Sequence, residues 1–141
     1  MLDPFMFLES ESKASIEAGH DIILKDAQSV KMFDLKGASS VNVVAGNDIS
    51  VSTKDGQVVS LIDADESSTA NITSNRNMTL DIGVAAPVVH AKGQVNLKAG
   101  NNMTLSTTGA DGRDLKIANL YADGDKAVIT AEATEGTLTI S

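Results

Sequence analysis

A short corner sequence recurs four times along this chain of 141 residues. The clearest copy is VNVVAGNDISV (41–51), and the others are ASIEAGHDIIL (14–24), ANITSNRNMTL (70–80) and VNLKAGNNMTL (95–105). Each copy places alternating apolar and polar residues on both sides of a sharp bend. The second bend residues lie 27, 29 and 25 residues apart, and they are Gly19, Gly46, Asn75 and Gly100. A repeat of this length is typical of solenoid proteins.

A third apolar piece closes each repeat. The four pieces are SVKMFDLKG (29–37), QVVSLIDA (57–64), APVVHAKG (86–93) and DLKIANLYADG (114–124). Three short strands per repeat make one turn of a coil, and stacked coils pair each strand in parallel with its copy in the next coil. The sequence therefore predicts an all-β fold, a parallel β-helix (solenoid) of about 4–5 coils with three short strands per coil.

The repeat also sets the expected boundaries. We expect an N-terminal cap or docking segment at 1–12 and β-helix repeats over 13–141, with coils at about 13–39, 40–68, 69–93, 94–125 and 126–141. The alternative fold is a β-sandwich built from hairpins, in which the AGND-like bends would serve as turns. A sandwich does not require the same corner at a fixed long period, so the repeat favours the β-helix.

The aligned positions predict what each column of side chains does. Residues that tolerate a positive φ and residues that form Asx turns mark the structural corner: Gly19, Gly46, Asn75, Gly100, Asp21, Asp48, Asn77 and Asn102. Two inward aliphatic columns follow the corner: Ile22, Ile49, Met78 and Met103, and then Leu24, Val51, Leu80 and Leu105. The residues between these columns should face outward, Ile23 among them. We expect φ to be positive at Gly46 and Gly100.

Composition excludes several functions. The net charge is −8 and the sequence lacks a cluster of Lys and Arg, so binding to nucleic acid is not expected. Cysteine is absent, which excludes disulfides and thiolate metal sites. The sequence contains no apolar run of about 18 residues, so no membrane-spanning segment is expected.

The strings IEAGHDIIL, VVAGNDISV and LKAGNNMTL resemble the haemagglutination-activity repeats of filamentous-haemagglutinin-like exoproteins, over residues 14–141. The resemblance implies a right-handed parallel β-helix, a structural shaft in a large secreted bacterial adhesin that supports adhesion or biofilm formation. It also implies two-partner secretion, a role in virulence, and a place outside the cell or on the bacterial surface. The implied partners are the rest of a longer parent chain and a ligand on a host or neighbouring cell. We also expect possible homo-oligomers, through the N-terminal segment or the coil ends.

Two other functions remain open on the sequence alone. Phage tails and secretion systems use β-helical spikes, some made of three intertwined chains, although these usually carry a shorter repeat. Some β-helix proteins are carbohydrate-active enzymes, which need clustered carboxylates. Candidate carboxylates lie in the loops at 62–67 and 107–114, where Asp63, Asp65 and Glu66 could meet Asp111 and Asp114 beside Arg113.

Neither histidine carries a predicted catalytic role, since His20 and His90 lack an oriented partner that the sequence identifies. Closely spaced aspartates offer oxygen ligands for calcium at Asp63 and Asp65, at Asp111 and Asp114, and at Asp123 and Asp125. Aspartate is also an ordinary turn residue, and no calcium-loop motif accompanies these pairs. We therefore expect no enzyme activity, no cofactor and no metal site.

Overall fold

The computed structural model describes residues 6–8, 12–28, 32–54, 60–82, 87–107 and 120–141, and these form three five-stranded parallel sheets. Sheet A contains β1 (Met6–Leu8), β4 (Phe33–Leu35), β7 (Ile62–Ala64), β10 (Val89–Ala91) and β13 (Leu120–Ala122). Sheet B contains β2 (Lys13–Ala18), β5 (Ser40–Ala45), β8 (Thr69–Ser74), β11 (Gln94–Ala99) and β14 (Val128–Ala133). Sheet C contains β3 (Ile22–Gln28), β6 (Ile49–Lys54), β9 (Met78–Ile82), β12 (Met103–Thr107) and β15 (Leu138–Ile140).

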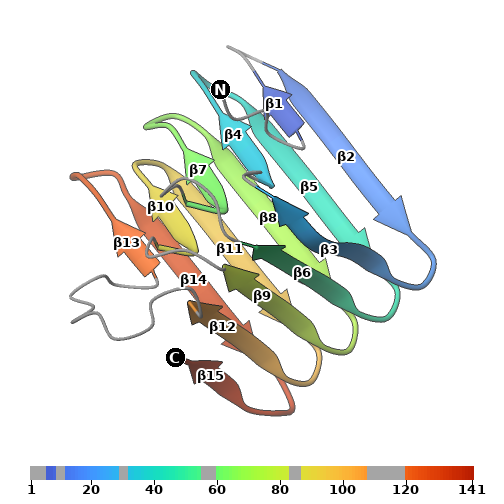
Figure 1. Ribbon diagram of the computed structural model, residues 1–141. Coiled ribbons are helices and arrows are strands. Elements are labelled where there is room, and N and C mark those ends of the chain that lie inside the picture. The colour runs from blue at the N-terminus through green and yellow to red at the C-terminus, as the bar shows by residue number, and fades with distance from the viewer. Residues whose placement is uncertain (1–5, 9–11, 29–31, 55–59, 83–86, 108–119) are drawn as a thin grey trace.

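The strand order confirms the parallel β-helix. Each sheet takes every third strand of the chain, so consecutive strands such as β4, β5 and β6 belong to three different sheets and together make one coil. Figure 1 shows the successive coils lying side by side, with equivalent strands running in the same direction. Every strand pair among the described residues is parallel, which excludes a sandwich of hairpins there.

The N-terminal segment supplies a strand to the first coil. Within the segment 1–12, β1 pairs in parallel with β4, so that Met6 lies beside Phe33 and Leu8 beside Leu35. Counted from sheet A, the described strands make five coils, each with one strand in every sheet. The described residues contain no helix long and apolar enough to cross a membrane.

The core consists of stacked side chains of the same kind. Ile49, Met78 and Met103 are neighbours in consecutive coils and are at most 1% exposed. Val51, Leu80 and Leu105 form the adjacent column, which is equally buried. In the first coil, Ile22 and Leu24 continue these columns but are only partly buried, because β3 is the outermost strand of sheet C among the described residues. Between the columns, Ser50, Thr79 and Thr104 face outward, as does Ile23, which is 65% exposed.

The corner glycines are not needed for a positive φ, and the expectation for Gly46 and Gly100 is wrong. Among the described glycines, φ is positive at Gly37 (62°) and Gly124 (110°). A Cβ at Gly46 would lie 2.1 Å from the carbonyl oxygen of Gly19, and a Cβ at Gly100 would lie 2.1 Å from that of Asn75. Glycine is therefore required at these two corners because the backbone of the preceding coil lies too close for a side chain.

The Asx residues of the corner bond the next coil rather than their own turn. Asp21 Oδ1 accepts a hydrogen bond from the backbone N–H of Asp48 at 3.0 Å. The same bond recurs from Asn77 to Asp48, from Asn102 to Asn77 and from Thr137 to Asn102, at 3.0, 3.2 and 2.9 Å. One Asx side chain per coil thus satisfies one backbone donor of the following coil, which stabilises the stack at its tightest bend.

Candidate functional site

The outer face of sheet A gathers the ionisable side chains that the fold brings together from different coils. The strands β7, β10 and β13 share the pattern apolar–polar–Ala, which buries the first and third residues of the first two strands and turns the middle residue outward. The register therefore places Asp63, His90 and Tyr121 next to one another in consecutive coils. Asp34 of β4 precedes them in the same row.

His90 joins three coils. Its Nδ1 atom lies 2.9 Å from Asp63 Oδ1 in the preceding coil, and its Nε2 atom lies 3.2 Å from Asp123 Oδ2 in the following coil. Its ring stacks on Tyr121 with a centroid distance of 5.1 Å and an interplanar angle of 23°. An ionised carboxylate can only accept hydrogen bonds, so the imidazole makes both bonds when both ring nitrogens carry hydrogen and the ring is positively charged.

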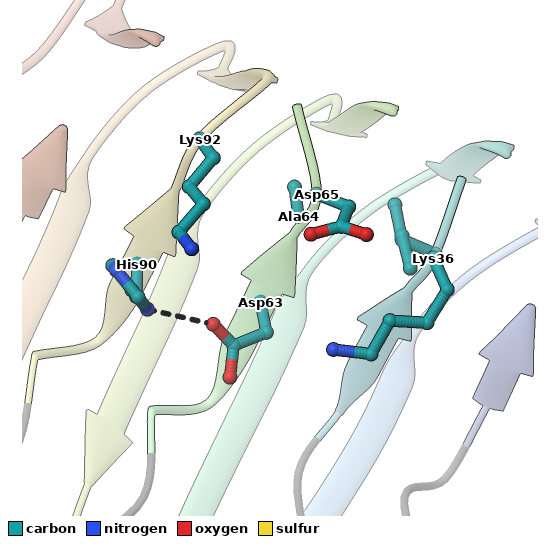
Figure 2. A pocket seen from close by; sticks show the side chains of 7 residues that line it. Lys36, Asp63, Ala64, Asp65, His90 and Lys92 are labelled. Atoms are coloured by element: carbon teal, nitrogen blue, oxygen red, sulfur yellow. Dashed lines mark hydrogen bonds and ion pairs between the residues drawn. The ribbon is translucent and has the colours of Figure 1, made fainter. Parts of the chain in front are cut away.

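A small polar cavity of about 250 Å³ opens beside His90. Figure 2 shows Asp63 between Lys36 on one side and His90 with Lys92 on the other. Asp65 also lines the cavity, and Lys36 Nζ lies 3.4 Å from Asp34 Oδ1. Lysines and carboxylates alternate here, so the lining carries charges of both signs and favours neither an anion nor an apolar molecule.

A second polar cavity of about 270 Å³ shares Lys92 with the first. Glu66, Asp123 and Asp125 line it, together with Gly124 and Lys126. Lys126 Nζ lies 3.5 Å from Glu66 Oε1, and both side chains are about two-thirds exposed (70% and 66%). Such an exposed ion pair contributes little to stability.

The ionisable side chains around His90 are placed to form ion pairs rather than to act on a substrate. Both nitrogens of His90 are occupied by carboxylates, so in this conformation the ring has no nitrogen directed at a substrate. His20 lies exposed at the corner, where its backbone carbonyl accepts the N–H of Asn47. Within the described ranges, no three His, Asp or Glu side chains are arranged to hold a metal ion.

The predicted carboxylate sites are only partly described. Asp63 and Asp65 line the first cavity and Glu66 lines the second, and His90 lies between Asp63 and Asp123. The expected partners Asp111, Arg113 and Asp114 lie outside the described residues. Of the calcium candidates, Asp63 and Asp123 are each paired with His90, and Asp125 lines the second cavity.

No known protein family, curated protein or solved structure matches this chain.

The bridge through His90 was missed from the sequence. The strands IDA, VHA and LYA contain only three residues each and follow segments of unequal length, so their register was not apparent. Their shared apolar–polar–Ala pattern is the signal that could have aligned Asp63, His90 and Tyr121.

Proposed function

We propose that this chain is a structural shaft segment of a secreted bacterial exoprotein, of the filamentous-haemagglutinin-like kind that its repeats resemble. The observation that carries the proposal is the continuity of bonding between coils. All three sheets run through five coils, and the Asx hydrogen bonds connect every corner to the next. A body bonded in this way resists bending, and its paired strands resist proteolysis.

Side chains on the outer faces add further links between coils. Asn96 Nδ2 donates to Asn71 Oδ1 at 2.8 Å on sheet B, and Ser106 Oγ donates to Asp81 Oδ1 at 2.8 Å on sheet C. The bridge through His90 joins three coils on sheet A. Polar groups on every face thus link the coils, as a stiff shaft requires, and the role we propose involves no catalysis.

The alternative of a spike made of three intertwined chains fits this fold less well. In such a needle, neighbouring strands of one coil belong to different chains. Here each coil consists of consecutive strands of one chain, as in β4, β5 and β6. Sedimentation of the purified chain as a monomer would agree with this, whereas an obligate trimer would favour the spike.

Surface labelling tests the proposed location and role. An antibody raised against the purified chain should label intact cells of the organism that encodes it, or the medium in which they grow. An antibody against a cytoplasmic enzyme serves as the control for cell integrity. Labelling only after permeabilisation would contradict a secreted shaft. Cleavage of any polysaccharide in a screen of common glycans would contradict a purely structural role.

A further inference from the structure

The two carboxylates beside His90 require more hydrogen-bond donors than a neutral imidazole has. Asp63 Oδ1 lies 2.9 Å from the Nδ1 atom of His90, and Asp123 Oδ2 lies 3.2 Å from its Nε2 atom. A neutral ring has one N–H group and one lone pair, so it can donate to only one of these carboxylates. The other carboxylate then faces a lone pair at hydrogen-bond distance, which is repulsive. The bridge across three coils is therefore complete only while both ring nitrogens carry hydrogen.

The surroundings of His90 suit a positively charged ring. Tyr121 stacks on the imidazole with a centroid distance of 5.1 Å, and an aromatic face attracts a cation within about 6 Å. Lys92, which lines both cavities, opposes a second positive charge. Carboxylates nevertheless outnumber lysines among the described neighbours. The further charged groups of the two cavities and of β4 are Asp34, Lys36, Asp65, Glu66, Asp125 and Lys126.

The fold holds the two bridging carboxylates to different degrees. Asp63 is the middle residue of β7, which is paired with β4 on one side and with β10 on the other. Asp123 follows the end of β13, in a turn where Gly124 has a φ of 110°. Its distance to the ring is also the longer of the two. A neutral ring should therefore keep its hydrogen on Nδ1 for Asp63, and Asp123 should be the carboxylate that is released.

The turn at 123–126 depends on this bond for its position. In the described part of the chain it is joined to earlier coils by the bond from Asp123 to His90, by the backbone bond from Asp123 N–H to the carbonyl of Ala91 at 2.8 Å, and by the pair of Lys126 with Glu66 at 3.5 Å. The last pair is exposed and contributes little. Loss of the bond to His90 thus leaves one backbone hydrogen bond as the main attachment of the turn.

We propose that His90 is a pH-operated clasp that joins the third, fourth and fifth coils on sheet A. At acidic pH the charged ring holds both Asp63 and Asp123 and closes the turn at 123–126 against the fourth coil. As the pH rises and the ring loses a proton, Asp123 is released, and the turn opens the second cavity, which it lines. Histidine side chains change charge between about pH 5 and 8, and His90 is 29% exposed, so protons can reach it from solvent. The clasp is independent of the proposed location of the protein.

The fluorescence of Tyr121 reports the charge of the ring. Tyr121 is the only tyrosine and the chain has no tryptophan, and a charged imidazole stacked on a phenol quenches its emission more strongly than a neutral one. Emission should rise from about pH 5 to about pH 8 in the wild type and should stay constant in His90→Gln. His20→Gln is the matched control and should behave as the wild type, since His20 lies exposed at the corner. Emission that does not change in the wild type, or changes equally in His90→Gln, would overturn the proposal.

Amide hydrogen exchange reports the release of the turn. After correction for the intrinsic pH dependence of exchange, the protection of the Asp123 N–H should fall about fivefold between about pH 5 and 8, as expected for the loss of one hydrogen bond. The N–H of Asp65 is the internal control, because it donates to the carbonyl of Leu35 at 2.9 Å in the equivalent position two coils earlier. Its protection should not change. An equal fall at both amides would indicate general loosening of the stack and would overturn the proposal.

Asp123→Asn separates the clasp from other effects of pH. A carboxamide accepts a hydrogen through its oxygen and donates one through its nitrogen, so it can bond Nε2 of His90 in either protonation state. This variant should keep the turn protected at both ends of the pH range, while the emission of Tyr121 still follows the charge of the ring. An equal fall in protection in the wild type and in Asp123→Asn would overturn the proposal, as would a wild type whose turn stays protected while the ring loses its charge.

Discussion

Asp48 Oδ1 accepts a hydrogen bond of 3.0 Å from the backbone N–H of Asn77, which lies one coil further along the stack. The same carboxylate receives two bonds from the guanidinium group of Arg76, at 3.0 and 2.8 Å. Asp48 thus neutralises a charged neighbour and satisfies a backbone donor at the corner. Asp48 therefore makes an ion pair and a backbone hydrogen bond to the same neighbouring coil, and substitutions at this position can separate the two.

Asp48→Ala should destabilise the chain by about 1 kcal/mol, the typical net value of a lost hydrogen bond. Asp48→Asn should cost less, because its Oδ1 atom can still accept from Asn77. Urea denaturation followed by circular dichroism compares the two variants with the wild type. Equal stability of Asp48→Ala and the wild type would show that the corner bond contributes nothing to the stack.

Acid should remove part of the stabilisation at this corner. The side-chain hydrogen bond from Arg76 holds the pKa of Asp48 below its ordinary value of 3.8, and the N–H of Asn77 and the charge of Arg76 lower it further, against a partial burial that raises it. A lowered pKa in the folded state stabilises the fold above the ordinary pKa, and this stabilisation is lost as the pH falls through the lowered value. The advantage of wild type over Asp48→Asn should therefore be constant near neutral pH and shrink below 3.8. A difference that does not change with pH would contradict this.

The corner glycines offer a test with a control in the same column. Gly46→Ala and Gly100→Ala should each destabilise the chain by about 1–3 kcal/mol, because the new Cβ would collide with a backbone carbonyl of the preceding coil. Gly19→Ala should change stability by less than about 0.5 kcal/mol, since nothing lies within 4 Å of its Cβ position. Thermal melts of the three variants make the comparison. Equal costs at Gly19 and Gly46 would indicate that backbone freedom, and not contact between coils, selects glycine.

The sequence predicted the fold where repeats were strictly alike. The four repeats can be aligned in only one way on the Asp or Asn after each bend and the two aliphatic residues that follow it. That alignment gives the register of Ile49, Met78 and Met103. The reason is physical: in a parallel stack each residue lies beside its own equivalent, so packing selects the same kind of residue in every coil.

The sequence could not predict contacts that depend on distance between coils. Glycine is needed at Gly46 because the carbonyl of Gly19, 27 residues earlier, lies too close for a side chain. In the sequence, this requirement looks the same as a requirement for a positive φ, since both place a glycine at the bend. The bridge of His90 to Asp63 and Asp123 depends on the register of three-residue strands that follow segments of unequal length. Such short strands carry too few alternating positions to fix their pairing.

Polar substitution should distinguish the two faces of sheet C sharply. Leu80 is fully buried between Val51 and Leu105, so Leu80→Asp would bury an unpaired charge and should unfold the chain. Thr79→Asp should be tolerated, because its side chain faces outward between Ser50 and Thr104. Circular dichroism of the two variants decides the point. Unfolding by Thr79→Asp with tolerance of Leu80→Asp would mean that the faces are reversed.

Backbone proton contacts measured by nuclear Overhauser spectroscopy test the stacked parallel register most directly. Thr79 lies between Ser50 and Thr104 in sheet C, and each pair belongs to consecutive coils. The parallel β-helix predicts contacts from the backbone protons of Thr79 to those flanking both Ser50 and Thr104. Contacts that instead pair β5 with β6 in antiparallel fashion across the Gly46 bend would indicate hairpins and contradict the β-helix.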